Sequence, residues 1–305
     1  MAKDPLLVLP VDCTMGVDCY IHDYVDRDPG TGVLDFGCGS LTRNDHTGTD
    51  FAVLTHAARH RGVNVIAASP GRVVWVNDGM DDIASTAPNA PDITGKSCGN
   101  GVAIRHGGGW VTRYCHLKQG SIAVANGQRV RLRTVLGQVG MSGMSNYPHI
   151  HFTVTKLGQV VDPFAPDMQA NCTSTPTKTL WQTPMPYTTA GWLRAGFAPT
   201  PPSRAEVDDG IDGHPRLSRD LAVFGAWGHF YGVRKDDILR TTWVHPDGTE
   251  EITSLTAGID NQRNVRWVSK VGGSDGFAPG PHSVRFELER GGKILDQITS
   301  STVVD

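Results

Sequence analysis

The sequence predicts an all-β protein, mainly antiparallel, that folds as two domains. The chain has 305 residues, enough for two domains that each bury a core of their own. Glycine (36 residues) and proline (19) are abundant and charged residues make up only 19%, a profile typical of turn-rich β proteins rather than helical bundles. Short runs rich in β-branched and aromatic residues recur along the chain, each bounded by Gly, Pro, Asn or Asp, as strands joined by turns require.

Residues 1–45 are predicted to form an irregular, disulfide-stapled N-terminal segment. They lack sustained hydrophobic periodicity and contain three cysteines and the turn-forming stretch DPGTG. The first residues, MAKDPLLVLPVDC, are too short and too weakly apolar to be a complete signal peptide.

Residues 46–170 form the first predicted domain. A short helix is expected in LTHAARHRG, and a polar, turn-rich stretch at 78–100 is expected to be a long loop, a kind of segment that often has a function. Six runs are expected to be strands: VNVIAA, GRVVWVN, GVAIRH, WVTRYCHL, RTVLGQVG and HIHFTVT.

Residues 171–204 repeat Pro, Thr and Ser and are predicted to be an extended connector. From 205 to 305 strand-like runs return at a spacing of about ten residues, which favours a β-sandwich of immunoglobulin-like type. Its tryptophans are interpreted as core residues rather than as a sugar-binding platform. Because a sandwich fold does not settle function, binding of a glycan or of a protein partner stays open for this domain.

Charge and hydropathy exclude two classes of protein. The formal net charge is −3 and no basic run is present, whereas a nucleic-acid binder usually shows a clustered basic face. No apolar run approaches the ~18 residues that a membrane-spanning helix needs. We therefore expect no nucleic-acid partner and no transmembrane segment.

The six cysteines form no CxxC pair, which argues against a cysteine-ligated zinc site or a thioredoxin-like centre. An even number of scattered cysteines suggests disulfides and an oxidising compartment, with free buried thiols as the alternative. About 15 pairings are open to six cysteines. One pair can be named, because Cys98 and Cys115 flank a predicted hairpin that turns at Gly107–Gly109.

Three separated elements contain residues that could hold a metal ion. HIHF places His149 and His151 on one face of a predicted strand. NDHTGTDF supplies His46 and Asp50, and imidazole nitrogens and carboxylate oxygens are both good Zn²⁺ ligands. YCHL places His116 at the end of a hairpin strand. Each element alone is weak, since HxH could be two polar positions on a sheet and Asp50 a solvated or capping residue.

Taken together, these elements resemble the catalytic domain of the M23 zinc metallopeptidases, the lysostaphin/LytM-type peptidoglycan endopeptidases. The resemblance covers roughly residues 44–165 in the family's order. Its motifs are an HxxxD (HTGTD), a strand pair, a glycine-led hairpin ending in Tyr and His (GNGVAIRHGGGWVTRYCHL), a glycine-rich run (NGQRVRLRTVLGQVGMSG), HIHF and a DP dipeptide.

The resemblance implies a zinc-dependent endopeptidase with an M23-like β-sheet catalytic domain, acting on peptidoglycan stem or cross-bridge peptides. It implies that His46, Asp50 and His151 ligate Zn²⁺, which leaves a fourth position for water. His149 and His116 match the two non-ligand histidines. His149 is our choice of general base, and His116 would stabilise the oxyanion or protonate the leaving amine, although either imidazole could serve in either role.

Two departures from the family pattern bear on substrate preference rather than on metal binding. Thr153 stands where the family often has an acidic residue, and Asn146 and Tyr147 replace small residues before HxH. The alternative function is a non-catalytic M23-like module that binds cell wall or regulates another hydrolase. A cupin is disfavoured because Thr155 and Lys156 stand where its Glu would be. Cysteine usage and substrate class point to a periplasmic or extracellular location.

Overall fold

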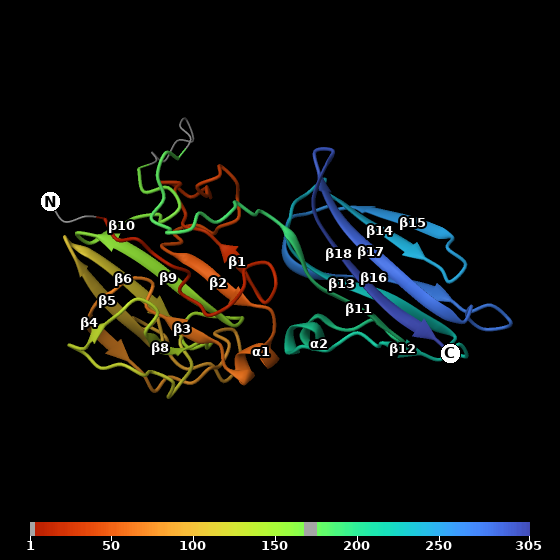
Figure 1. Ribbon diagram of the computed structural model, residues 1–305, viewed down its shortest axis with the longest axis horizontal. Helices are drawn as coiled ribbons and strands as arrows, with labels where there is room; N and C mark the ends of the chain where they lie inside the picture. The colour runs from red at the N-terminus through yellow and green to blue at the C-terminus, as the bar shows by residue number, and fades with distance from the viewer. Residues whose placement is uncertain (1–3, 168–175) are drawn as a thin grey trace. The chain divides into compact units, whose positions relative to one another are not determined.

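The computed structural model describes residues 4–167 and 176–305, and it divides the chain into two compact units, Met1–Tyr187 and Thr188–Asp305 (Figure 1). The prediction of an all-β, mainly antiparallel protein is confirmed, because strands dominate both units. The helices in the described part of the chain, α1 (His56–Arg61) and α2 (Arg204–Asp209), have six residues each. None of the described helices is long and apolar enough to cross a membrane.

The first unit is built on an eight-stranded sheet with the order β1-β2-β9-β6-β5-β4-β7, in which β10 also pairs with β9. All of its ladders are antiparallel. Its strands are β1 (Cys19–Asp23), β2 (Thr49–Val53), β4 (Gly71–Asn77), β5 (Gly101–Gly107), β6 (Trp110–Cys115), β7 (Arg129–Val130), β9 (His149–Lys156) and β10 (Gln159–Val160). A separate pair is formed by β3 (Asn64–Ile66) and β8 (Val135–Gln138).

Strand β9 shows why the sheet has one apolar and one polar face. Ile150, Phe152 and Val154 are buried on one side, and aromatic neighbours such as Trp181 pack against Phe152 there. Each such side chain stabilises the fold by about 1.5–3 kcal/mol when it is removed from water. The alternate residues of β9, which begin with His149 and His151, point to the other face. That second face bears the candidate site.

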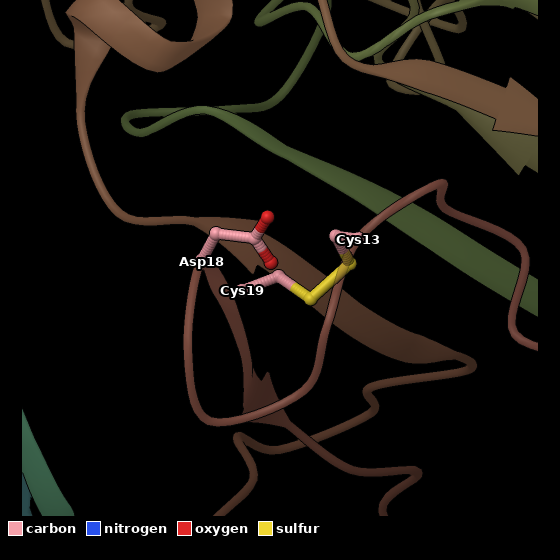
Figure 2. A group of neighbouring side chains, drawn as sticks. All are labelled: Cys13, Asp18 and Cys19. Carbon is pink, nitrogen blue, oxygen red and sulfur yellow. A yellow bond between two sulfur atoms is a disulfide. The ribbon is translucent and has the colours of Figure 1, made fainter.

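The N-terminal segment differs from the prediction of an irregular stretch over residues 1–45. Strand β1 pairs with β2 and extends the main sheet, and all five of its residues are buried. The strand is short, and its partner lies far along the chain, so local pattern did not distinguish it from the surrounding turns. A disulfide joins Cys13 and Cys19 beside Asp18 (Figure 2). Because both sulfurs are in this bond, the cluster offers no thiolate to a metal.

The second unit contains a three-stranded sheet, β11-β13-β16, and a five-stranded sheet, β12-β18-β17-β14-β15. One buried core takes side chains from both sheets, among them Phe224 of β13 and Phe286 of β17. Trp227 and Trp243 are fully buried, in agreement with their interpretation as core residues. The strands are β11 (Gly191–Ala198), β12 (Arg216–Leu217), β13 (Val223–Val233), β14 (Ile238–Val244), β15 (Glu250–Thr256), β16 (Asn261–Val271), β17 (Gly280–Arg290) and β18 (Lys293–Val304).

The predicted domain boundary at 205 lies too late in the chain. Strand β11 falls within the predicted connector 171–204 and pairs along its length with β13, so the second unit begins at Thr188. Prolines on both sides of β11 made this stretch resemble a linker, and its partner strand lies further along the chain. Cys172 and its neighbours in the predicted connector lie outside the described residues. The immunoglobulin-like type of the sandwich stays a prediction.

Candidate metal centre and active site

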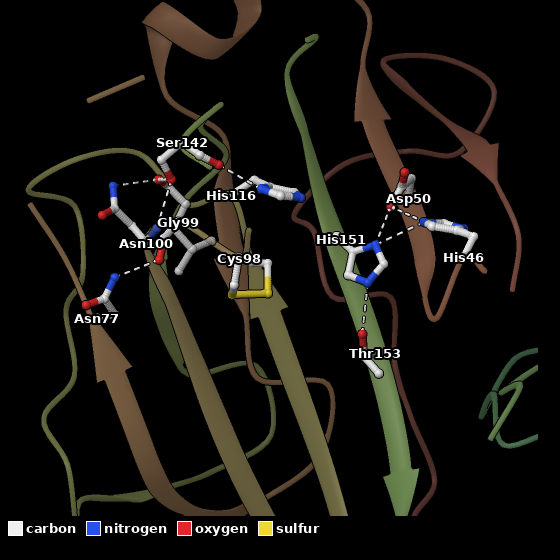
Figure 3. The surroundings of a disulfide bond; sticks show 12 residues. His46, Asp50, Asn77, Cys98, Gly99, Asn100, His116, Ser142, His151 and Thr153 are labelled. Carbon is white, nitrogen blue, oxygen red and sulfur yellow. Dashed lines mark hydrogen bonds and ion pairs between the residues drawn. A yellow bond between two sulfur atoms is a disulfide. The ribbon is translucent and has the colours of Figure 1, made fainter. Parts of the chain in front are cut away.

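One row of the sheet gathers the candidate metal ligands. Asp50 on β2 stands directly opposite His151 on β9, and His151 stands opposite Cys115 on β6. His46 lies in the loop that leads into β2. A Cβ on Gly48 would come within 2.7 Å of the His151 ring, so this position of the HTGTD turn must stay free of a side chain. Ligand atoms of His46, Asp50 and His151 all lie within 4.8 Å of one another (Figure 3).

The donor atoms of this cluster fit a bound cation. His46 Nδ1 donates to the carbonyl oxygen of Tyr24 at 2.6 Å, so its Nε2 bears a lone pair. This Nε2 lies 3.1 Å from Asp50 Oδ1 and 3.0 Å from His151 Nδ1, and the latter lies 2.9 Å from the same oxygen. Thr153 Oγ1, at 3.0 Å, can accept the proton of His151 Nε2. Three acceptors then converge, an arrangement that a cation stabilises, and the outer partners fix both rings as in known metal sites.

Electrostatics in the cluster favour an ionised Asp50. Burial opposes its charge, but the adjacent His46 and His149, and the hydrogen bonds that the rings of His151 and His46 donate to Asp50 when they are protonated on the side that faces it, hold the pKa of Asp50 well below its usual value. Burial also lowers the pKa of His46, yet Asp50 outweighs it and the pKa of His46 lies above its ordinary value. The carboxylate is thus the fixed negative charge of the site.

His149 and His116 are neutral imidazoles beside this cluster. His149 Nδ1 donates to the carbonyl oxygen of Tyr147 at 2.9 Å, and burial lowers the pKa of His149 to about 4. His116 Nδ1 donates to the carbonyl oxygen of Ser142 at 2.7 Å, and burial with two neighbouring imidazoles holds the pKa of His116 well below its ordinary value. The two ring centroids lie 4.7 Å apart. Each ring therefore keeps an unprotonated Nε2 that can accept a proton.

The backbone at His116 is held by the predicted disulfide, since Cys98 and Cys115 are indeed bonded. His116 has φ of 64°, a left-handed conformation that is rare for residues other than glycine. Its N–H donates to the carbonyl oxygen of Cys98 at 2.9 Å, and its carbonyl oxygen accepts from Gly140 at 3.0 Å. The disulfide thus ties the end of the 78–100 loop to the strand that presents His116 (Figure 3).

Comparison with known proteins identifies a family that matches the region containing this site. The model of peptidase family M23 matches residues 44–163. This part of the chain is an M23 domain. The cell division protein DipM of Caulobacter vibrioides is 32% identical over 121 residues, 38% of this chain and 18% of DipM. The DD-carboxypeptidase/endopeptidase Mpg of Neisseria meningitidis is 45% identical over 65 residues, 21% of this chain and 14% of Mpg.

A solved structure, the catalytic domain of the prophage-encoded M23 protein EnpA from Enterococcus faecalis, is 26% identical. The comparison covers 54% of this chain and 95% of that domain, with a TM-score of 0.33. This chain spans less than a quarter of the length of the two curated relatives. The family-model match over residues 44–163 confirms the resemblance to M23 peptidases stated from the motifs, and this region contains all five candidate site residues.

A groove of about 640 Å³ opens over the M23 site. Its lining includes His46, His116 and His151, together with Cys98 from the long loop and the exposed Met144. The predicted loop at 78–100 is irregular throughout, and its end forms part of the groove wall. The site is thus open to a substrate that lies across the polar face of the sheet.

Sequence reasoning missed the residues that surround Asp50 on its other side. Arg43 Nη1 binds Asp50 Oδ2 at 3.0 Å and also forms an ion pair with Asp23 of β1. The hydroxyl of Tyr147 donates to the same oxygen at 3.2 Å. The Tyr147 ring stacks on His149 at 4.3 Å and on His22 of β1 at 4.1 Å. Tyr147 was noticeable as a departure from the family pattern, but no local signal linked β1 to the site.

Three other histidines of the first unit do not join the M23 site. His56 and His60 both lie on α1, and neither belongs to a metal-ligand cluster among residues 4–167 and 176–305. His106 bonds the carbonyl oxygen of Pro70 at 2.9 Å and Thr112 Oγ1 at 2.8 Å, and these contacts give it a structural role.

Proposed function

We propose that this protein is a zinc-dependent endopeptidase that hydrolyses peptide bonds of peptidoglycan stem or cross-bridge peptides. The observation that supports this most is the convergence of His46 Nε2, Asp50 Oδ1 and His151 Nδ1, each oriented by a partner outside the cluster. The match of residues 44–163 to the M23 family model, and relatives named as a cell division protein and a DD-carboxypeptidase/endopeptidase, support the same substrate class.

His46, Asp50 and His151 would hold Zn²⁺. The ion would polarise the scissile carbonyl and lower the pKa of a water molecule to about 7. His149 would accept the proton of the attacking water at Nε2, because its Nδ1 proton is committed to the carbonyl oxygen of Tyr147. His116, with its Nδ1 fixed on Ser142, would bind the developing oxyanion or protonate the leaving amine through Nε2 after that nitrogen has accepted a proton of the attacking water, either directly or from His149.

The disulfides of the described residues, Cys13–Cys19 and Cys98–Cys115, support a location in the periplasm or outside the cell, because such bonds persist in oxidising compartments. The second unit would contribute binding of a glycan or a protein partner.

Zinc analysis combined with muropeptide digestion tests the proposal. His151→Ala is expected to lose the metal and all cleavage, because it removes a ligand. His149→Ala is expected to retain the metal and lose cleavage, because it removes only the proton acceptor. If the wild-type protein binds no zinc and leaves purified cell wall intact, the proposed enzymatic function is wrong, and a non-catalytic wall-binding or regulatory module is favoured.

A further inference from the structure

Three arginines stand in register across neighbouring strands of the main sheet. Arg72 on β4 is directly opposite Arg105 on β5, and on its other side it is directly opposite Arg129 on β7. Directly opposed side chains lie on the same face with Cβ atoms about 4.5–5.5 Å apart, and like charges in such positions destabilise a sheet. We call these three residues the arginine row.

The charges of the row are not neutralised within the protein. Among residues 4–167 and 176–305, no ion pair joins Arg72, Arg105 or Arg129 to a carboxylate. Arg72 Nη1 donates to the carbonyl oxygen of Gly127 at 2.6 Å. All three side chains are exposed. Other arginines of the same unit do pair, as Arg133 does with Asp12 at 3.2 Å.

The arginines border a hollow of about 680 Å³, to which Arg131 adds a fourth guanidinium. Guanidinium groups recognise carboxylate and phosphate oxygens through paired hydrogen bonds. Uncompensated positive charge around a hollow, in a chain of net charge −3, is the arrangement expected of an anion site. Sequence inspection found no basic run because Arg72, Arg105 and Arg129 come from separate strands and meet only through the strand register.

The row shares the face of the sheet that bears the catalytic groove. Arg105 is opposite Val111 of β6, and Val111 is opposite Thr155 of β9. Val111 and Thr155 both line the groove, and Thr155 lies on the same face of β9 as His151. Four strand spacings of about 4.8 Å place β7 roughly 19 Å from β9. An extended polymer that enters the groove can therefore cross the row.

We propose that the arginine row is a second binding subsite that holds free carboxylates of peptidoglycan peptides, on the same polymer as the bond to be cleaved. This inference rests on the proposed function only for the identity of the polymer. Several anionic groups on one chain fit guanidinium groups at intervals of about 5 Å along one line. The subsite would position the wall polymer over the groove without touching the reacting atoms.

The test is a co-sedimentation assay with purified peptidoglycan sacculi, using the full chain in the His149→Ala background so that binding is measured without cleavage. The double variant Arg72→Gln/Arg105→Gln is expected to raise the Kd for sacculi about tenfold. A change of this size is expected when at least one charge-assisted hydrogen bond to a carboxylate is lost. The matched control is Arg133→Gln/Arg216→Gln, which removes the same charge from two exposed, paired arginines and should bind as the background does. Relief of like-charge repulsion should leave the Tm of the row variant at or above that of the control.

Sacculi whose carboxylates have been converted to neutral amides identify the ligand. They are expected to bind the background protein about as weakly as native sacculi bind the row variant. Equal binding of the row variant and the control to native sacculi overturns the subsite. Undiminished binding of the background protein to amidated sacculi also overturns it, and would point to a phosphate-bearing wall polymer. If binding depends on the arginine row but the wild-type protein cleaves no cell wall, the subsite is supported and the proposed enzymatic function is refuted.

Discussion

His149 in the first unit and His229 in the second are alike in most measures that are used to identify catalytic residues. Both are buried, at 1% and 0% exposure. His149 Nε2 lies 3.5 Å from Asp50 Oδ2, and His229 Nε2 lies 3.6 Å from Asp208 Oδ1. Burial lowers the pKa of His149 to about 4 and, with nearby arginines, the pKa of His229 to about 3.

The difference lies in what orients each ring. His149 has one nitrogen bound to a backbone carbonyl, and its ring packs at 4.7 Å against that of His116, which lines the groove. Neither nitrogen of His229 has a hydrogen-bond partner in the described structure, and the neighbouring charges are Arg194, Arg204 and Arg263. A buried histidine near a carboxylate is therefore not sufficient for a site. A ring held by a backbone carbonyl beside converging candidate ligands distinguishes the first unit from the second.

The strongest test of this difference is to remove the charge from the carboxylate beside each histidine, Asp50 in the first unit and Asp208 in the second. Asp50→Asn is expected to reduce zinc content to less than about a tenth and cleavage by about 10³-fold or more, because a ligand and the fixed negative charge are lost together. Asp208→Asn makes the same chemical change beside His229. Metal analysis after equilibrium dialysis and digestion of purified wall measure both effects.

The Asp208→Asn variant is expected to keep wild-type zinc content and cleavage, since the pair in the second unit has no converging ligands. It should lose some stability through the ion pair of Asp208 with Arg263, which lies at 2.9 Å. A loss of zinc or of cleavage equal to that of Asp50→Asn would show that the two histidine environments are not distinguished by their orienting contacts.

The same contrast explains how much of the site the sequence could predict. The resemblance carried by the short motifs HxxxD and HxH predicted that His46, Asp50 and His151 come together, and the three side chains do cluster, although each motif alone was weak. The carbonyl oxygens of Tyr24 and Ser142 that orient the imidazoles come from distant segments and depend on tertiary packing. No local pattern encodes such contacts.

Two strands of the predicted all-β fold were missed for a related reason. The strands β1 and β11 are short or flanked by turn residues, and each is stabilised by a partner strand far along the chain. The arginine row likewise exists only through the register of β5, β4 and β7. Most strands and the motifs were predictable from local sequence, whereas register and sheet extension were not.

A smaller effect is expected for Tyr147→Phe, which tests one contact that orients Asp50. The substitution removes the hydroxyl that donates to Asp50 Oδ2 and keeps the ring stacked on His149. We expect zinc affinity to fall about 10–100-fold, the usual effect of losing an outer partner of a metal ligand. Competition with a chelator measures the Kd. Tyr231→Phe, in the second unit, is a control that should leave the Kd for zinc unchanged. An unchanged Kd in Tyr147→Phe would show that the Tyr147 hydroxyl does not stabilise zinc binding through Asp50.

The smallest expected effect concerns the pH dependence of folding stability. A buried group in each unit changes the free energy of unfolding with pH, and the two changes have opposite signs. The pKa of His229 is about 3 in the folded protein and about 6.5 when unfolded, so the unfolded state binds the proton more tightly. Its contribution to stability is present above pH 6.5 and is lost as pH falls toward 3, with a slope of at most about 1.4 kcal/mol per pH unit. Burial instead raises the pKa of Asp162 to about 6, so its contribution is present below about pH 4 and is lost as pH rises to about 6.

Urea unfolding of His229→Gln and Asp162→Asn between pH 4 and 7, read for each unit by hydrogen exchange of β13 and β9 amides, separates the two contributions. Relative to the wild type, His229→Gln should flatten the loss of stability on acidification in the second unit. Asp162→Asn should flatten the loss on raising the pH in the first unit, where Arg27 at 3.4 Å only partly compensates the buried carboxylate. Parallel pH profiles for wild type and variants in both units would mean that water reaches these side chains, since desolvation of the charged form is the main cause of the two opposite slopes.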